Sequence, residues 1–271
     1  MREWLQKLCD RIKMPAAAAQ QVIAGFDEKS WQDMRVVLKK LRTPESWTEG
    51  LEELKAAALA DEDGLAVLTL LLAESYYVHQ EYQEKGISDT IFYETFACFS
   101  RFVKEYQESY GRYGFDRTFW VVRQLSLRLF RIGQLEFEIE RYREENIISV
   151  HIPSDADIAL KNCHDSYQKT RIFLKEFFPV FAQCRFFCGS WLLAPGLQEI
   201  LPETSNIIQF QKEYEIAEVE PEADDIMQWV FKKADIPLAD VPQDTSLQRK
   251  LKDYLQQGNT IGLAKGYLNF P

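Results

Sequence analysis

The side chain best suited to acid–base chemistry in this 271-residue sequence is His151. It ends an expected strand, just before Pro153, and an imidazole with a pKa of about 6.5 exchanges protons near neutrality. We expect a general base; the alternative is a histidine that only holds the Pro153 turn. Glu138, with Glu136, lies on the polar face of the preceding expected strand and could act as a base through water. A solvated strand face explains the same two glutamates.

Cys188 is a candidate for covalent catalysis. A thiol beside a histidine is an activated nucleophile, and His151 would approach Cys188 if their strands are neighbours. Phe186, Phe187 and Leu192 surround Cys188 in the sequence and favour a buried, inert thiol instead. The five cysteines contain no CxxC pair and the three histidines are far apart. We therefore expect neither a disulfide framework nor a metal site.

Composition limits the possible partners. The chain is 46% hydrophobic and 27% charged, as in ordinary globular proteins, and its formal charge of -10 opposes binding to phosphate backbones. The longest apolar run, 64–73, is too short to span a bilayer, and the first residues are typical of an amphipathic helix rather than a signal peptide. We expect a cytoplasmic protein with small-molecule ligands and no nucleic-acid or membrane partner. The oligomeric state stays open.

The first half of the chain has helical periodicity throughout. Capping boxes are expected at Ser30 with Asp33 and at Ser46 with Glu49. Gly133 is expected to stop the last helix. The expected helices are 4–12, 16–24, one after each capping box, 61–86, 88–110 and 117–131. Residues 1–132 are therefore predicted to form an all-helical N-terminal domain.

The period changes at Gly133, after which apolar residues alternate with glutamates as in a strand. Expected strands are 135–140, 147–152, 184–191, 206–219 and 260–270, and expected helices are 157–178, 195–201, 224–233 and 245–256. The first two strands should form a hairpin, and a helix crossover should lead to the third. Residues 133–271 are thus predicted to form a mixed, mostly antiparallel sheet flanked by helices, which makes the chain α+β.

Short segments in this second half resemble a known family. They are His151-Ile152-Pro153-Ser154-Asp155, Cys188-Gly189-Ser190-Trp191-Leu192-Leu193, Leu201-Pro202 and Ser205-Asn206-Ile207-Ile208-Gln209-Phe210. Their order is similar to that in the bacterial two-domain acyltransferase-like family, in which an all-helical N-acyltransferase N-terminal domain precedes a GNAT-like C-terminal domain. The resemblance covers essentially the whole chain.

The resemblance implies an acyltransferase that moves an acyl group from coenzyme A (CoA) or a carrier thioester to an amine-type acceptor, with acyl-CoA as a cosubstrate and no tightly bound cofactor. Such a reaction needs a base, oxyanion donors and an acid for the thiolate. Ser190 could donate to the acyl carbonyl and Trp191 could wall the acyl or pantetheine channel. A packed tryptophan beside a backbone-bonded serine is the alternative. Ser154, Asn206 and Gln209 are further candidate substrate or cosubstrate contacts.

One segment departs from the GNAT pattern. A GNAT-type enzyme meets the pyrophosphate of its donor with backbone amides of a glycine-containing loop, and the equivalent segment here, 151–157, has no glycine. It carries Asp155 and Asp157, which would oppose a pyrophosphate but would suit the start of the following helix. A non-catalytic binding or regulatory protein on the same fold is therefore the second interpretation. A hydrolase that uses Cys188 or Ser190 is the third.

Negative charge is concentrated in the second half of the chain. Residues 1–131 have a net charge of -2 and residues 132–271 a net charge of -8, with seven carboxylates and no cation between Glu213 and Asp225. If 206–219 is a strand, Glu213 and Glu215 share one face and could attract a cationic acceptor. A solvated strand face that continues into an acidic loop is the alternative. We expect the active site to lie between the domains, near His151 and Ser190.

Overall fold

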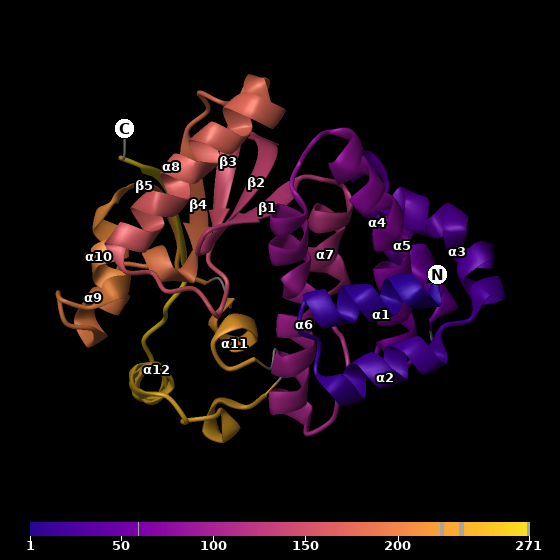
Figure 1. The fold of residues 1–271 in the computed structure, drawn as a ribbon. Helices are drawn as coiled ribbons and strands as arrows, with labels where there is room; N and C mark the ends of the chain where they lie inside the picture. The colour runs from indigo at the N-terminus through magenta and orange to yellow at the C-terminus, as the bar shows by residue number, and fades with distance from the viewer. Residues whose placement is uncertain (59, 223–224, 233–235, 270–271) are drawn as a thin grey trace. The chain divides into compact units, whose positions relative to one another are not determined.

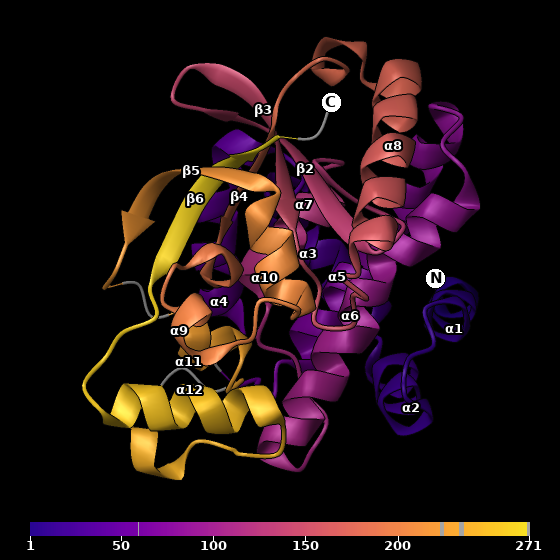
Figure 2. The same cartoon turned by 90° about the vertical axis from the view of Figure 1, so that its left-hand side faces the viewer.

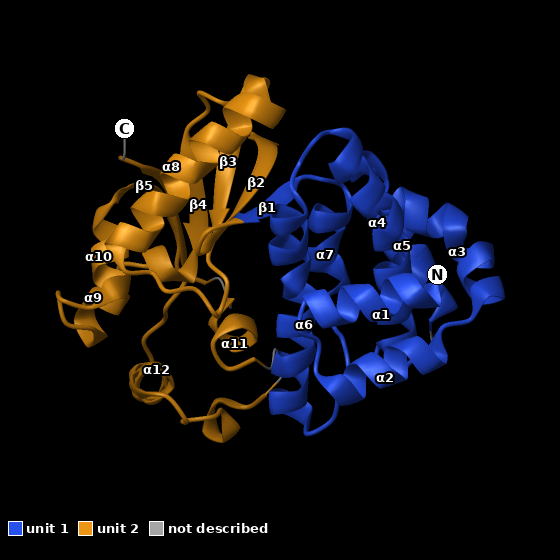
Figure 3. Cartoon of the chain, in the orientation of Figure 1, with its two compact units in different colours: residues 1–131 blue, residues 132–271 orange. Residues whose placement is uncertain are grey.

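The computed structural model describes residues 1–58, 60–222, 225–232 and 236–269. These residues form two compact units, 1–131 and 132–271 (Figure 3). A helical region is followed by a sheet with helices, so the α+β prediction is confirmed (Figure 1). The expected ends Asp224, Lys233 and Phe270 lie outside the described residues.

The first unit is built around α5 (Leu65–Glu84), which contacts α1 (Arg2–Arg11), α2 (Ala16–Gly25) and α3 (Glu28–Lys40). It also contacts α6 (Asp89–Tyr110) and α7 (Thr118–Leu125). Because α5 has neighbours all round, buried side chains cover most of its circumference. The remaining helix of this unit, α4 (Trp47–Ala57), packs on α3 and follows a 3₁₀ turn at Pro44–Ser46.

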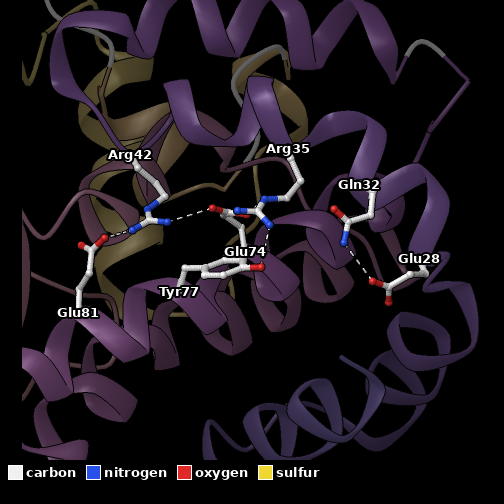
Figure 4. Close-up of polar contacts among 7 residues, drawn as sticks. All are labelled: Glu28, Gln32, Arg35, Arg42, Glu74, Tyr77 and Glu81. Carbon is white, nitrogen blue, oxygen red and sulfur yellow. Dashed lines mark hydrogen bonds and ion pairs between the residues drawn. The ribbon is translucent and has the colours of Figure 1, made fainter.

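A buried carboxylate joins α5 to the end of α3 (Figure 4). Glu74 has no exposed surface, and its Oε1 lies 3.1 Å from Nη1 of Arg42 while its Oε2 lies 3.4 Å from Nε of Arg35. Arg42 also pairs with Glu81, and Arg35 donates to the Tyr77 hydroxyl at 2.7 Å. The two guanidinium groups thus compensate a charge that burial alone would make costly.

Neither capping box that the sequence predicts is present. The N-cap of α3 is Asp27, whose carboxylate accepts the Ser30 N–H at 2.7 Å, because the helix begins three residues earlier than the predicted box. Ser46 stands at the N-cap of α4, but its hydroxyl donates to the Lys40 carbonyl at 2.9 Å instead of accepting from the helix.

The helix expected over 117–131 is wrong in its second half. α7 ends at Leu125, Leu127 adopts a left-handed φ of 54°, and β1 (Leu129–Ile132) follows. A left-handed residue ends a helix, so the chain can turn into the sheet. The side chains of β1 are largely buried. The apolar residues that suggested the end of a helix therefore belong to a buried strand.

The sheet has the strand order β1-β2-β3-β4-β6-β5. The strands are β2 (Leu135–Tyr142), β3 (Glu145–His151), β4 (Phe186–Ser190), β5 (Tyr214–Glu220) and β6 (Leu263–Leu268). β2 and β3 form the expected antiparallel hairpin, whose two turn residues, Arg143 and Glu144, both have positive φ. β3 and β4 are parallel because α8 (Leu160–Phe177) crosses between them. β6 pairs antiparallel with both β4 and β5, and Figure 2 shows β5 and β6 side by side.

The strand expected over 206–219 is wrong in its first half. Residues Asn206–Lys212 form α10, and β5 begins only at Tyr214. Ser205 caps α10 by accepting the Ile207 N–H at 3.3 Å, and Ile208 and Gln211 point inward at helical spacing. The other helices are α9 (Leu197–Ile200), α11 (Asp225–Trp229) and α12 (Ser246–Gln256). Their apolar side chains form a core around Leu197 and Leu251 with Ile208 of α10.

Candidate functional site

The two parallel strands separate soon after they meet. β3 and β4 pair at only two positions, Ile148 with Phe186 and Ser149 with Phe187. β4 continues to pair with β6 as far as Ser190. In the described part of β3 and β4, no further position of one strand pairs with the other. The facing backbone edges beyond Ser149 and Phe187 therefore have no strand partner there.

A histidine–carboxylate pair lies where β3 leaves β4. Nε2 of His151 is 2.9 Å from Oε2 of Glu138 on the neighbouring strand. The His151 side chain is 22% exposed and the Glu138 side chain 6% exposed. The imidazole can thus reach a ligand while the carboxylate behind it is shielded from water. Of the sequence-predicted site residues, these two are brought together.

The polar face of the hairpin is not a solvated one, which corrects the structural alternative for the two glutamates. Glu136 and Glu138 are 1% and 5% exposed. Glu136 is the register partner of His151, and Glu138 is the register partner of Ser149. The Ser149 hydroxyl donates to Glu140, the third glutamate of the same face. Burying a carboxylate lowers the stability of the fold unless the carboxylate is hydrogen-bonded. This face of the hairpin is therefore a buried polar surface rather than a solvated one.

Ser190 and Trp191 make the contacts expected of a backbone-bonded serine beside a packed tryptophan, which was the alternative to a role in catalysis. The Ser190 hydroxyl accepts the Leu192 N–H at 3.1 Å at the start of a 3₁₀ turn, Trp191–Leu193. Trp191 packs against the apolar core around Leu197. Strand alternation puts Ser190 on the same face as Phe186, whereas the register relates Phe187 and Ser149 to the face of Glu138. Ser190 and His151 therefore lie on opposite faces of the sheet.

The remaining predicted contacts are on separate elements. Ser154 is exposed in the turn between β3 and α8, and Asn206 is the exposed first residue of α10. Gln209 donates to the Glu203 carbonyl at 2.6 Å. The Asp157 carboxylate accepts from the Ala159 N–H at 3.1 Å and from the Asn162 side-chain amide at 2.8 Å. It therefore stabilises the start of α8, as expected for a carboxylate that suits the start of that helix.

Comparison with known proteins decides the family. The N-acyltransferase N-terminal domain family matches residues 3–127, and the GNAT-like C-terminal domain family matches residues 129–268. The chain belongs to the two-domain N-acyltransferase family. The resemblance predicted from the short segments is thereby confirmed. No curated protein sequence is significantly similar to the chain.

Solved structures of acyltransferases share the fold of this family member. One, in complex with decanoyl-CoA and teicoplanin, is 24% identical with a TM-score of 0.83, covering 98% of this chain and 87% of its own. Another, in complex with CoA and 10C-teicoplanin, has the same identity, coverage and TM-score. A third, with decanoyl-CoA alone, is 20% identical with a TM-score of 0.81 and covers 98% of this chain and 87% of its own.

The cysteines of this N-acyltransferase family member are poorly suited to nucleophilic catalysis. Cys188 has no exposed surface, and burial raises the pKa of its thiol far above the ordinary value. Burial also raises the pKa of Cys9 to about 11 and that of Cys163 to about 12. A thiol that stays protonated is a weak nucleophile. Among the described residues, no group of three or more histidine, cysteine, aspartate and glutamate side chains could hold a metal ion.

Carboxylates of the acidic tract have hydrogen-bond or ion-pair partners on other elements. Glu213 lies 2.6 Å from Nε2 of His164 on α8, and Glu218 lies 2.7 Å from Nη2 of Arg143 in the hairpin turn. Glu220 pairs with Lys265 on β6. Since Glu213 ends α10 rather than continuing a strand, it shares no strand face with Glu215, and that expectation is wrong.

In the part of the chain that the structure describes, no helix combines the length and the apolarity needed to cross a bilayer.

The sequence reading missed two residues next to the site. Gln211, 5% exposed on α10, donates from Nε2 to the carbonyls of Leu192 at 3.0 Å and Ala194 at 2.8 Å, which fixes the turn after β4. Gly189 lies within β4, close to that turn. A glycine within an expected strand was the available signal for the second, but nothing in the sequence relates Gln211 to residues 17 and 19 positions earlier.

Proposed function

We propose that the chain transfers an acyl group from the thioester of an acyl-CoA to an amine. The observation that carries the proposal is the separation of β3 from β4 directly beside the His151–Glu138 pair. Backbone groups without a strand partner can hydrogen-bond the amide-containing arm of a CoA donor. The family membership of both halves of the chain supports the same reaction.

His151 is proposed to take the proton of the attacking amine. In this proposal Nε2–H of His151 donates to Oε2 of Glu138, and Nδ1 is the ring nitrogen that takes the proton. The carboxylate then stabilises the imidazolium that forms when Nδ1 takes the proton. The amine nitrogen bonds to the acyl carbon, the carbon–sulfur bond breaks, and the CoA thiolate that leaves is protonated to the thiol.

The charge that develops on the acyl oxygen needs donors. Backbone N–H groups on the unpaired edges of β3 and β4 are the nearest candidates, because fixed amides stabilise an oxyanion without reorganising. The Ser190 hydroxyl remains a prediction for this role. Its hydrogen bond from Leu192 leaves the O–H free to donate, but it lies on the other face of the sheet from His151.

CoA is proposed as the donor class because the solved structures of the same fold are described with decanoyl-CoA, CoA and octanoyl-CoA. The acceptor is proposed only as an amine. Teicoplanin is the acceptor named for one relative of the fold.

Thermal unfolding with CoA and with acetyl-, octanoyl- and decanoyl-CoA tests the proposal. A ligand present at 100 times its dissociation constant should stabilise the protein by about 2.7 kcal/mol. Release of CoA thiol in the presence of a panel of primary amines should then depend on the amine. Absence of any shift with all four compounds would overturn the proposal.

The glycine-free loop favours one second candidate, a binding protein on this fold. Asp155 and Asp157 precede α8 where an anion would have to approach. In that case acyl-CoA or a carrier-bound acyl group still shifts the unfolding temperature, but no amine in the panel releases thiol. Retained thioester cleavage without any amine would instead indicate a hydrolase.

A further inference from the structure

Neither the backbone conformation nor the packing of this protein requires a glycine at position 189. Gly189 is an exposed residue inside β4, and its backbone is not in the left-handed region. A Cβ added there would lie 3.5 Å from Cγ of Lys265 and 4.0 Å from Cε1 of Phe187, which are ordinary van der Waals distances. A side chain would therefore fit, and it would stabilise the strand, because glycine is unfavourable in a strand interior.

The other described glycines of the second unit do have a reason in the backbone or the packing. Gly133 and Gly258 have positive φ values of 67° and 86°. A Cβ at Gly262 or Gly266 would come within 2.0 or 2.7 Å of a backbone oxygen, and one at Gly196 would lie 3.0 Å from Ile261. Gly189 is thus the exception among them, which points to something outside the chain that approaches its backbone.

The strand register puts Gly189 level with the histidine. Ser149 pairs with Phe187, so two residues further along each parallel strand are His151 and Gly189. Alternation directs both positions toward the face that carries Glu138. Because the pairing of β3 with β4 has stopped by then, Gly189 is level with His151 without being its strand partner.

We infer that Gly189 is a specificity-determining residue, which leaves room for the acyl-thioester end of the donor to lie against β4 next to His151. This inference rests on the proposed function. A side chain at position 189 would occupy the place of the thioester or of the first carbons of the acyl chain. It would act on the reacting end of the donor and leave the nucleotide end unaffected.

The test compares Gly189→Ala and Gly189→Val with a control, Ala217→Val, which places the same valine side chain at an exposed position of β5. We expect all three to unfold at or above the wild-type temperature. We expect Gly189→Val to lower kcat/KM for octanoyl-CoA by about 100-fold, since misplacing a reacting group by an ångström has an effect of this size. Gly189→Ala should lower it less, and Ala217→Val should not change it.

The dissociation constant of CoA itself should stay within about twofold in every variant, because CoA lacks the acyl group. Wild-type kcat/KM in Gly189→Val, for short and long donors alike, would overturn the inference and leave the proposed function standing. If the wild-type protein neither binds nor turns over acyl-CoA, both fail. If Gly189→Val does not fold, Gly189→Ala decides alone, and a kcat/KM equal to that of the wild type overturns the inference.

Discussion

The hydrogen bond between His151 and Glu138 runs diagonally across the β2–β3 hairpin. The residue directly opposite His151 is Glu136, and the residue opposite Glu138 is Ser149. Diagonal neighbours are still within reach of long side chains, and Nε2 and Oε2 are 2.9 Å apart. β2 and β3 thus position the imidazole at the end of β3, beyond the last position at which β3 pairs with β4.

Replacing Glu138 tests the role of this pair. Glu138→Gln preserves size and a hydrogen bond but removes the charge that would stabilise the imidazolium, so we expect kcat to fall by about 100-fold or more with little change in the dissociation constant of CoA. His151→Gln should lower kcat at least as much. The control is Glu144→Gln at the hairpin turn, where the carboxylate is 91% exposed. Steady-state kinetics that show equal kcat in Glu138→Gln and the wild type would exclude the proposed role.

Removing the buried carboxylate of the first unit should destabilise the protein strongly. Glu74→Ala leaves Arg35 and Arg42 without their shared partner, and breaking a buried ion pair in this way costs about 3–5 kcal/mol. Urea denaturation measures the loss. Glu84→Ala, at the exposed end of the same helix, is the control and should change the free energy of unfolding by less than about 0.5 kcal/mol.

The cap of α3 gives a stability contribution that depends on pH. The backbone hydrogen bond from Ser30 holds the pKa of the exposed Asp27 carboxyl below its usual value. The unfolded chain therefore binds the proton more readily, so the cap stabilises fully above the unfolded pKa of about 3.9 and loses its effect as the pH falls through the lower folded pKa. Asp27→Ala should lower the unfolding temperature at pH 7, and the difference from the wild type should shrink below pH 4. A difference that stays constant down to pH 2 would contradict this.

Gln211 offers a test of the turn after β4. Gln211→Ala leaves the Leu192 and Ala194 carbonyls without their side-chain donor, which should lower the free energy of unfolding by about 1–3 kcal/mol. Gln209→Ala, on the same helix, removes only a bond to the exposed Glu203 carbonyl and should have a smaller effect. Chemical denaturation of both variants compares them directly, and equal losses would show that the buried bonds contribute nothing.

Thiol labelling of the native protein should separate one cysteine from the other four. Cys184 is half-exposed, whereas Cys9, Cys98, Cys163 and Cys188 are buried. Because burial raises the pKa of Cys188, its thiolate is scarce as well as inaccessible. We expect one fast thiol at pH 8 and five after denaturation. Fast labelling of Cys188, or loss of activity in Cys188→Ala, would revive the nucleophile hypothesis.

The sequence by itself determined the local elements with strong patterns. The helix expected over 88–110 is α6, and the glutamate alternation after Gly133 is the strand β2 of the expected hairpin. The short motifs also identified the family, because they depend only on residues close together in the chain. Such signals are local, and side-chain periodicity reports them directly.

Only the tertiary structure decided the features that give the site its form. The sequence pattern of 206–212 fits a strand or a helix, and inward packing of Ile208 and Gln211 selects the helix. The burial of Glu136 and Glu138, the diagonal bond to His151 and the early separation of β3 from β4 depend on strands that are distant in sequence. Register and burial are properties of pairs of strands, so no single stretch of residues encodes them.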